Sequence, residues 1–273
     1  MIELPEAKAI STELNHVLKG VKILDAIVCQ TKHQLAWMND SVEYYSKTLE
    51  NRMIHQVLQS GGMVRIVMDD EIELVISEDA EIGYVKKSDV PEKHQLLLTL
   101  SNQMYLYLKV KMYAFMLLGS PSVLNENIYY QRSTTAIDPL SDFYTLDIFK
   151  KDTEMDKGVA SLKSALATKQ HIPGLCNGIL QDILLNAGFR PEKKVNSMEE
   201  SEIKHLYDAM KKTLSLMIEH GGRAKIGALS NALGGYQVLL DGKTNECPIC
   251  HQSVIKKAYL GGKVIYCPHC QKE

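Results

Sequence analysis

The amino-acid sequence predicts an α+β protein with more than one domain. The first half of the 273-residue chain has the pattern of one helix followed by strands, and the second half has the pattern of helices. Two Cys-x-x-Cys pairs near the end are typical of a small module stabilised by a metal ion. A chain of this length suits two domains, or one domain with an appended module.

Residues 4–19 are predicted to form an amphipathic helix. Pro5 suits the first turn of a helix, and Glu6 places a negative charge at the positive end of the helix dipole. The pattern ends near Gly20. The apolar residues of its buried face are Ile10, Leu14, Val17 and Leu18.

From residue 21 to about residue 118 the pattern is that of strands. The predicted strands cover residues 22–28, 64–68, 73–76, 95–100 and 104–112. In the last of them apolar residues alternate with a mixed face of Tyr105, Tyr107, Lys109, Lys111 and Tyr113. This mixed face is either a solvated strand surface or a platform on which nucleic-acid bases stack.

The second half is predicted to be helical after a linker at residues 119–137. Asp138-Pro-Leu-Ser141 is predicted to open a helix with Ser141 as its N-cap, and further helices are predicted at residues 159–168, 179–187 and 198–219. Two tight turns run from Lys169 to Asn177, which is predicted to cap the helix that follows. Such a segment is either an ordinary helical hairpin or a phosphate site made of backbone amides.

The cysteine pairs are Cys247 with Cys250 and Cys267 with Cys270, separated by sixteen residues. This spacing places four thiolates around one tetrahedral zinc ion. Cys250-His251 also completes a haem-attachment pattern, and the cysteines could pair as disulfides, but both alternatives require an exported chain. We therefore expect one structural zinc, with all four positions taken by protein ligands and none open for catalysis.

Other features of the sequence predict a cytoplasmic protein, with association with the nucleoid as an alternative, and a monomer is expected. The chain starts without a secretory signal, and no apolar run reaches the ~18 residues that a membrane span needs.

Residues 254–257 and 263–266 are predicted to pair as a hairpin between the cysteine pairs. Cys29 and Cys176 are expected to be buried thiols.

The net charge of −2 divides unevenly along the chain. Residues 1–130 carry 12 Lys and Arg against 17 Asp and Glu, a net charge of −5, and residues 131–273 carry 19 against 16, a net charge of +3. Contacts with phosphates supply most of the affinity of nucleic-acid-binding proteins. If the chain binds nucleic acid, we expect its second half to make most of the contacts.

Taken together, these segments resemble the formamidopyrimidine-DNA glycosylase and endonuclease VIII family. Met1-Ile-Glu-Leu-Pro-Glu6 is similar to the family's opening Met-Pro-Glu-Leu-Pro-Glu, and Asp138-Pro-Leu-Ser141 to the start of its helical domain. Pro173-Gly-Leu-Cys-Asn177 and Ala187-Gly-Phe-Arg-Pro191 are similar to its helix-two-turns-helix signature, and the four cysteines match its zinc finger. The resemblance implies an N-terminal helix and β-sandwich at residues 1–125, a helix-two-turns-helix domain at 138–235 and a finger at 236–273.

The resemblance also implies a reaction, whose main residue is missing. In the family an N-terminal proline, exposed by removal of methionine, attacks the sugar C1′ and forms a Schiff base, assisted by the adjacent glutamate. Here Ile2 stands at the proline position, so Met1 is expected to remain. Its amine would lie one residue, ~3.5 Å, out of register. Glu3, if the chain is active, and the Met1 amine are the catalytic candidates; Glu3 and Glu6 are alternatively structural, as partners of the helix dipole.

Other family residues align with unsuitable positions. In the family, a lysine on a β-hairpin assists the reaction, and its position aligns with Gly62 here. An arginine in the family's finger hairpin clamps the phosphate beside the lesion. Its position aligns with Gly262, where the neighbouring Lys263 lacks the bidentate geometry of arginine. The family also has a hairpin that inserts an apolar wedge into the base stack of DNA. Its position corresponds to Ile76-Ser-Glu-Asp-Ala80 here, whose acidic residues would be repelled by phosphates.

Three functions stay open at this point. The chain is an active DNA glycosylase with lyase activity, a non-catalytic relative that binds nucleic acid, or an interaction module without nucleic-acid binding. The substitutions at Ile2, Gly62 and Gly262 favour the second, with damaged or abasic duplex DNA as the expected partner and structured RNA or the ribosome as alternatives. The predicted nucleic-acid contacts are Lys169, Asn177, Arg190 and Lys263.

Overall fold

The computed structural model describes residues 1–155, 158–223 and 234–273. It divides into two compact units, residues 1–135 with 220–235 and residues 136–219 with 236–273. The sequence instead predicts three domains, with the finger apart from the helices. Residues 224–233, next to the expected boundary at 235, lie outside the described residues. Within the described ranges, no helix combines the length and the apolar character needed to cross a membrane.

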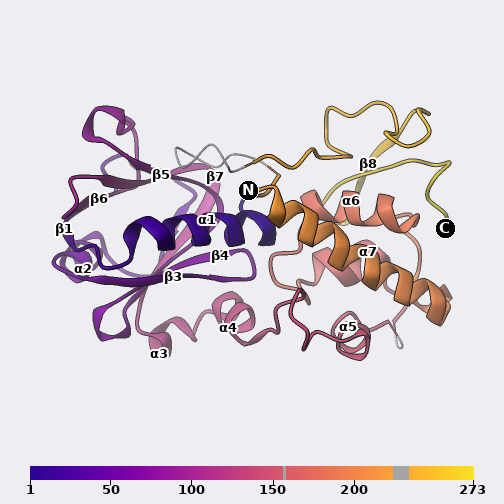
Figure 1. Cartoon of the computed structure of the whole chain (residues 1–273), viewed down its shortest axis with the longest axis horizontal. Helices are drawn as coiled ribbons and strands as arrows, with labels where there is room; N and C mark the ends of the chain where they lie inside the picture. The colour runs from indigo at the N-terminus through magenta and orange to yellow at the C-terminus, as the bar shows by residue number, and fades with distance from the viewer. Residues whose placement is uncertain (156–157, 224–233) are drawn as a thin grey trace. The chain divides into compact units, whose positions relative to one another are not determined.

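The first unit is rich in strands, with helices before, among and after them along the chain (Figure 1). The helices are α1 (Leu4–Leu18), α2 (Val42–Leu49), α3 (Pro121–Leu124) and α4 (Ile128–Thr135). The strands are β1 (Ile23–Val28), β2 (Ala36–Met38), β3 (Ile54–Ser60), β4 (Met63–Met68), β5 (Glu73–Val85), β6 (Leu96–Leu100) and β7 (Tyr105–Gly119). They form one sheet in the order β1-β6-β7-β5-β4-β3, and β2 pairs in parallel with β7.

The long strands β5 and β7 join the two halves of this sheet. Strand β6 pairs with residues 105–108 of β7, whereas β4 pairs with residues 73–77 of β5. The β5–β7 pairing shifts between Glu78 and Ala80, and such a bulge bends the strand that carries it. Both halves contribute to one apolar core, with α1 packed along β3 and β4 (Figure 1). The predicted helix and β-sandwich are confirmed.

Several predicted boundaries in the first unit are wrong. Residues 119–137 are not a linker, because they contain α3 and α4. The cap of α4 is Asn127, whose Oδ1 accepts the backbone N–H groups of Tyr129 and Tyr130. Residues 76–80 are not a hairpin loop, because they lie inside β5 and pair with β7. Strands β2 and β3 and helix α2 are absent from the prediction.

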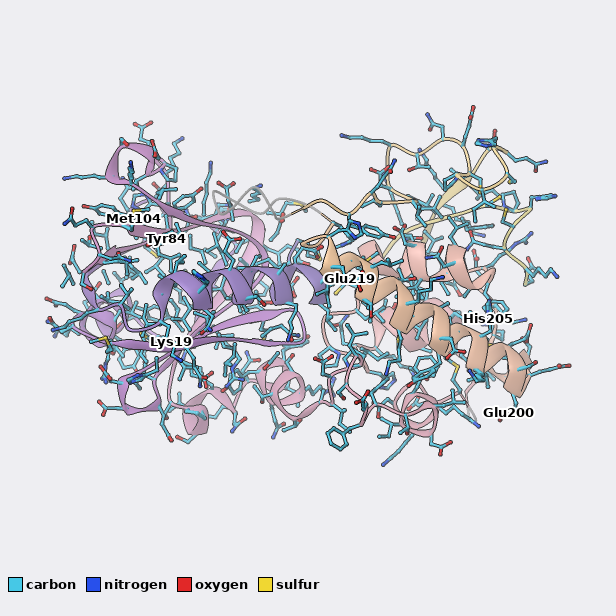
Figure 2. The ribbon with its side chains drawn as sticks, viewed as in Figure 1. Lys19, Tyr84, Met104, Glu200, His205 and Glu219 are labelled. Carbon is cyan, nitrogen blue, oxygen red and sulfur yellow. The ribbon has the colours of Figure 1, made fainter. Side chains whose placement is uncertain are left out.

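The second unit contains the remaining helices and the finger. The helices are α5 (Leu146–Asp152), a π-helical turn η3 (Ser164–Thr168), α6 (Asn177–Ala187) and α7 (Glu200–Glu219), and the finger strands are β8 (Ile255–Tyr259) and β9 (Gly262–Tyr266). Glu200 and Glu219 mark the two ends of α7 in Figure 2. Helix α6 packs against α7 and β9, and Leu185 of α6 belongs to the apolar core of the finger. The predicted finger hairpin is confirmed.

Three helix starts in the second unit differ from the prediction. Asp138 to Ser141 forms a turn, and the helix begins later, where the Thr145 hydroxyl accepts the N–H of Ile148 at 3.4 Å. The helix predicted at residues 159–168 begins only at Leu162 and continues as a π-helical turn. Helix α6 starts at Asn177 itself, so its N-cap residue is Cys176.

Candidate functional site

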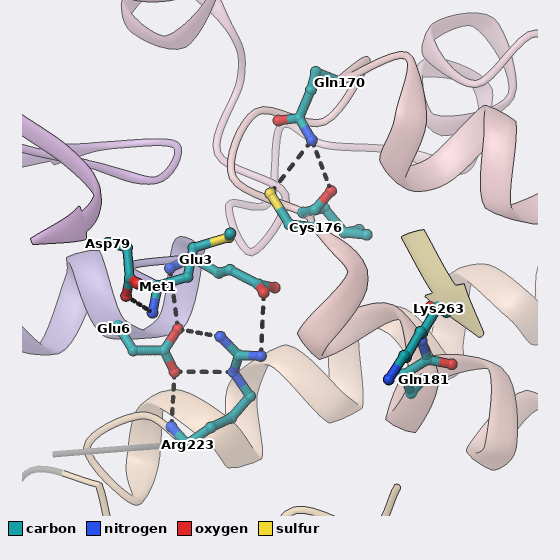
Figure 3. Close-up of polar contacts among 10 residues, drawn as sticks. Met1, Glu3, Glu6, Asp79, Gln170, Cys176, Gln181, Arg223 and Lys263 are labelled. Atoms are coloured by element: carbon teal, nitrogen blue, oxygen red, sulfur yellow. Dashed lines mark hydrogen bonds and ion pairs between the residues drawn. The ribbon is translucent and has the colours of Figure 1, made fainter. Parts of the chain in front are cut away.

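The first residues of the chain are fixed against β5. The backbone N–H of Ile2 donates to the carbonyl of Glu78 at 2.7 Å, and the Ile2 side chain is buried in the sandwich core. The Met1 ammonium lies 2.8 Å from Asp79 Oδ1 (Figure 3). The Met1 nitrogen is therefore paired with a carboxylate, and the next nitrogen along the chain, that of Ile2, is a backbone amide.

The two glutamates at the start of α1 form a reciprocal capping box. The carboxylate of Glu6 accepts the backbone N–H of Glu3 at 3.1 Å, and the Glu3 side chain accepts the backbone N–H of Glu6. Both residues are almost fully buried, at 3% and 1% exposure. Buried carboxylates require a compensating cation or several hydrogen bonds.

Arg223 supplies that cation. Its Nη2 lies 2.6 Å from Glu6 Oε2, and its Nη1 lies 3.3 Å from Glu3 Oε1 (Figure 3). Its Nε and backbone N–H both donate to Glu6 Oε1, at 3.0 and 2.8 Å. Burial lowers the pKa of Arg223, but the charges of Glu3 and Glu6 outweigh it, so the pKa lies above its ordinary value. The three side chains form a closed ion-pair cluster.

The glycine before Arg223 permits this close approach. Gly222 has a φ of +87°, which favours glycine, and a Cβ built on it would lie 3.2 Å from Glu6 Oε1. Arg223 was not predicted as a site residue, because an arginine after two glycines has no pattern that points to buried carboxylates far away in sequence. Gly62 lies in the two-residue turn between β3 and β4, since Ser60 pairs with Met63.

In the second unit, the predicted turns lead into the N-terminus of α6. The Gln170 side chain organises them, because its Nε2 donates to the carbonyl of Leu175 at 3.2 Å and to the Cys176 sulfur at 3.4 Å (Figure 3). Its Oε1 accepts the N–H of Gly174. Asn177 follows as an exposed residue in the first turn of α6, where backbone N–H groups lack helical partners.

Lys163 adds a buried cation that the sequence analysis missed. The residue is fully buried, its Nζ donates to the carbonyl of Tyr259 in the finger hairpin, and burial lowers its pKa. A Cβ built on Gly262 would lie 2.8 Å from Asn177 Nδ2 and 3.4 Å from Lys163 Nζ. Asn177, Lys163 and Gly262 therefore meet at one point, and we call them the Asn177 cluster. A cation beside a helix N-terminus is suited to binding an anion.

The other predicted contact residues have different surroundings. Lys169 is exposed and lies 2.5 Å from Glu154 Oε2. The Arg190 guanidinium donates to the carbonyls of Gln271 and Pro268, at 3.0 and 3.1 Å, and so holds the end of the finger. Lys263 is exposed on β9, and its carbonyl accepts from Gln181 of α6 at 3.2 Å (Figure 3).

The four finger cysteines form the metal centre. Their sulfur atoms all lie within 4.8 Å of one another, with Cys247 Sγ 3.8 Å from Cys270 Sγ and Cys250 Sγ 3.5 Å from Cys267 Sγ. A tetrahedral zinc ion with Zn–S bonds of ~2.3 Å requires sulfur separations of about 3.8 Å, so the residues fit zinc. Backbone N–H groups of Ile249 and Cys270 point at two of the sulfurs. The predicted structural zinc site is confirmed, with all four positions supplied by protein sulfurs.

Comparison with known proteins finds full-length relatives. No family model matches the chain. The formamidopyrimidine-DNA glycosylase of Shouchella clausii is 25% identical, with 99% of both chains covered. The protein of the same name from Lactococcus lactis subsp. lactis is 27% identical, with 100% of both chains covered. The one from Carboxydothermus hydrogenoformans is 34% identical over about half of each chain.

Solved structures share the fold. The Lactococcus lactis Fpg in complex with an abasic site containing DNA has a TM-score of 0.85 at 22% identity, covering 99% of this chain and all of that one. The complex of the same protein with an N7-benzyl-Fapy-dG containing DNA gives the same TM-score at 23% identity and the same coverage. Over its full length the chain is similar to formamidopyrimidine-DNA glycosylases, and it shares the fold of one of them.

Proposed function

We propose that this chain binds damaged or abasic DNA and that its base-excision chemistry is lost or crippled. The observation that carries the proposal is the N-terminus, where Ile2 replaces a proline and the Met1 ammonium is paired with Asp79 at 2.8 Å. DNA is the proposed binding partner because the chain is similar over its full length to DNA glycosylases and shares the fold of a protein solved with abasic-site DNA.

The chemistry fails at the nucleophile. Schiff-base formation requires an unprotonated amine within about 3–3.5 Å of the sugar carbon. The Met1 ammonium is held by Asp79, and the Ile2 nitrogen is an amide that donates to Glu78. General acid help from Glu3 is worth about 10²–10⁴ in rate, but only when a nucleophile is in place.

The carboxylates are also occupied. Glu3 and Glu6 bind Arg223, and each is part of the cap of α1. A carboxylate that must shuttle a proton during catalysis needs access to the reacting atoms. These contacts support the structural role of both glutamates.

Binding is assigned to the second unit. The Asn177 cluster joins the first turn of α6 to the buried cation of Lys163 and to the finger hairpin at Gly262. Phosphate contacts from helix N-termini and lysines fix a protein on DNA without reading its sequence. Lys263 and Lys169 are proposed as exposed contacts, and Arg190 is proposed to hold the finger in place for them.

Asn177→Ala tests this assignment. Loss of one hydrogen bond to a charged phosphate, worth about 1.5–3 kcal/mol, should weaken binding roughly 10- to 150-fold, equally for all DNA sequences. Fluorescence anisotropy at several salt concentrations should compare intact duplex, abasic-site duplex and structured RNA. Asn125→Ala, at an exposed asparagine after α3, is the matched control and should leave binding unchanged.

The same measurements test the phosphate site at the Asn177 cluster and distinguish DNA from RNA as the binding partner. A loss confined to one DNA sequence, or no loss at all, would contradict phosphate binding at the Asn177 cluster. Tighter binding to structured RNA than to either duplex would contradict DNA as the partner and indicate RNA instead.

A further inference from the structure

A cavity of 570 Å³ in the first unit is lined by residues of β2, β5, β7 and the start of α4. Four aromatic side chains line it, Trp37, Tyr113, Phe115 and Tyr129. Among the described residues of the lining, Glu78 has the only carboxylate, and none is a lysine or an arginine. Small-molecule sites usually have volumes of about 300–1,000 Å³, an apolar lining and few polar groups. The cavity therefore has the size and the composition of a small-molecule site with one negative charge.

The aromatic rings of this cavity are accessible to a ligand. Trp37 is 58% exposed and Tyr129 is 57% exposed. The face of an aromatic ring carries partial negative charge, so a cation within about 6 Å of the ring centre is attracted to it. Several rings around one space are the arrangement by which proteins recognise quaternary ammonium groups. Here the rings come from three separate segments, β2, β7 and α4.

Glu78 supplies the negative charge of the lining. It lies at the bulge of β5 with a φ of +69°, in the left-handed region that costs energy for a residue with a side chain. The charged groups that act on it are the Met1 ammonium and Asp79, which bind each other at 2.8 Å (Figure 3). Burial raises the pKa of Glu78, although Tyr113 donates a hydrogen bond to it. A cation in the cavity would favour the ionised carboxylate.

The amide oxygens of the lining are already occupied. Asn39 Oδ1 accepts the N–H of Leu118 and the hydroxyl of Tyr45, and its Nδ2 donates to the Leu118 carbonyl. Asn127 Oδ1 accepts two backbone N–H groups at the start of α4. A primary ammonium group brings three N–H donors that each need an acceptor, whereas a quaternary ammonium group brings none. The lining therefore favours a quaternary ammonium group.

We propose that this cavity binds a small quaternary ammonium ion, with its methyl groups against the aromatic rings and its charge balanced by Glu78. The charge of the surrounding chain agrees with this, because residues 1–130 carry a net charge of −5, which attracts cations. Binding requires no contact with DNA, so this ligand is additional to the proposed function.

Trp37 provides the readout, because it is the single tryptophan of the chain. The full-length protein should be titrated with choline, which carries a trimethylammonium group, above neutral pH to favour the ionised form of Glu78. The matched probes are ethanolamine, which has a primary ammonium group, and the uncharged analogue of choline in which carbon replaces the nitrogen. We expect a saturable change of Trp37 fluorescence with choline, at an affinity about 5-fold or more above that of the uncharged analogue. A peptide with one trimethylated lysine presents the same group on a macromolecule and should bind no more tightly than choline.

Two variants and one control test the roles of the charge and the rings. Glu78→Gln keeps the shape of the side chain and should weaken choline binding about 5-fold or more, the contribution of one unit charge at ~4 Å even in water, without weakening the uncharged analogue. Tyr129→Ala should weaken choline binding about 2- to 30-fold, the range for one cation–π contact. Phe143→Ala removes a ring that is 79% exposed in the second unit and should change nothing. Circular dichroism checks that each variant is folded.

Several results would overturn this inference. Equal affinity for choline and its uncharged analogue would make the cavity an apolar site, and unchanged choline binding in Glu78→Gln would remove the charge from recognition. Ethanolamine that binds as tightly as choline would contradict the quaternary group, and a peptide that binds more tightly would contradict a free small molecule. Duplex binding without any effect of choline on Trp37 would overturn the cavity site and leave the proposed DNA binding intact. A choline effect without duplex binding would support the cavity site and contradict the proposed function.

Discussion

Replacing Arg223 with alanine is expected to lower the free energy of unfolding of the first unit by about 3–5 kcal/mol. The guanidinium is the cation for two carboxylates, Glu3 and Glu6, that are almost fully buried. Removing it leaves charge in a place that water does not reach, and this costs far more than an exposed ion pair contributes. Arg223→Lys keeps the charge without the planar fork and should lie between alanine and the wild type.

Urea unfolding followed by circular dichroism and Trp37 fluorescence measures this effect, since Trp37 lies in the first unit. The matched control is Asp70→Ala, which removes the partner of Arg52 from an ion pair whose aspartate is 81% exposed. That loss should stay below about 1 kcal/mol. Equal losses for Arg223→Ala and Asp70→Ala would contradict a buried cluster.

Cys250→Ser is expected to abolish zinc binding and the order of the finger. Structural zinc in small fingers contributes about 10–16 kcal/mol of apparent binding free energy, which is also folding free energy. The damage should extend into α6, because Leu185 packs in the finger core and Asp182 accepts the N–H groups of Leu239 and Leu240 at 2.9 Å.

Elemental analysis should find one zinc per chain in the wild type and none in Cys250→Ser. Hydrogen exchange should then rise across residues 247–270 and at the end of α6. His269→Ala, in the second knuckle but outside the four sulfur ligands, should keep its zinc. Two metal ions per chain, or equal loss in both variants, would contradict the centre.

Regular periodicity explains which elements the sequence predicts well. Helices α1, α6 and α7, the finger hairpin and the strands with clear alternation were predictable, because a local pattern specifies each of them. The predicted strand at residues 73–76 is too short, because the acidic residues Glu78 and Asp79 interrupt its pattern. In the structure the pairing of β5 with β7 carries the strand past them.

Tertiary contacts explain the elements that the sequence analysis missed. Helix α4 has little amphipathic pattern, but its Tyr130 is buried and donates to Glu73 Oε2 at 3.0 Å. Glu73 also forms an ion pair with Arg65 at 2.5 Å. The partners of Tyr130 lie in β4 and β5, far away in sequence, so the residues around position 130 alone do not predict this helix.

Some residues of the candidate site could be predicted from local sequence, and others could not. The four cysteines are specified by spacing, and Ile2 by its position behind Met1. Lys163 and Arg223 acquire their roles only from partners far along the chain, Tyr259 for the lysine and the two glutamates of α1 for the arginine. Their sequence neighbourhoods contain no pattern that distinguishes them from surface residues.

Borohydride trapping on abasic-site DNA measures whether the N-terminus of this chain has lost the ability to form a Schiff base. A Schiff base between an amine of the protein and the sugar C1′ is reduced to a stable covalent adduct. We expect no adduct with this chain under conditions in which an active relative is trapped. Ile2→Pro restores a removable methionine and a secondary amine, and it should recover at most slow lyase activity while Gly62 and Gly262 lack side chains. A robust adduct with the unmodified chain would contradict the account and make the Met1 amine a working nucleophile.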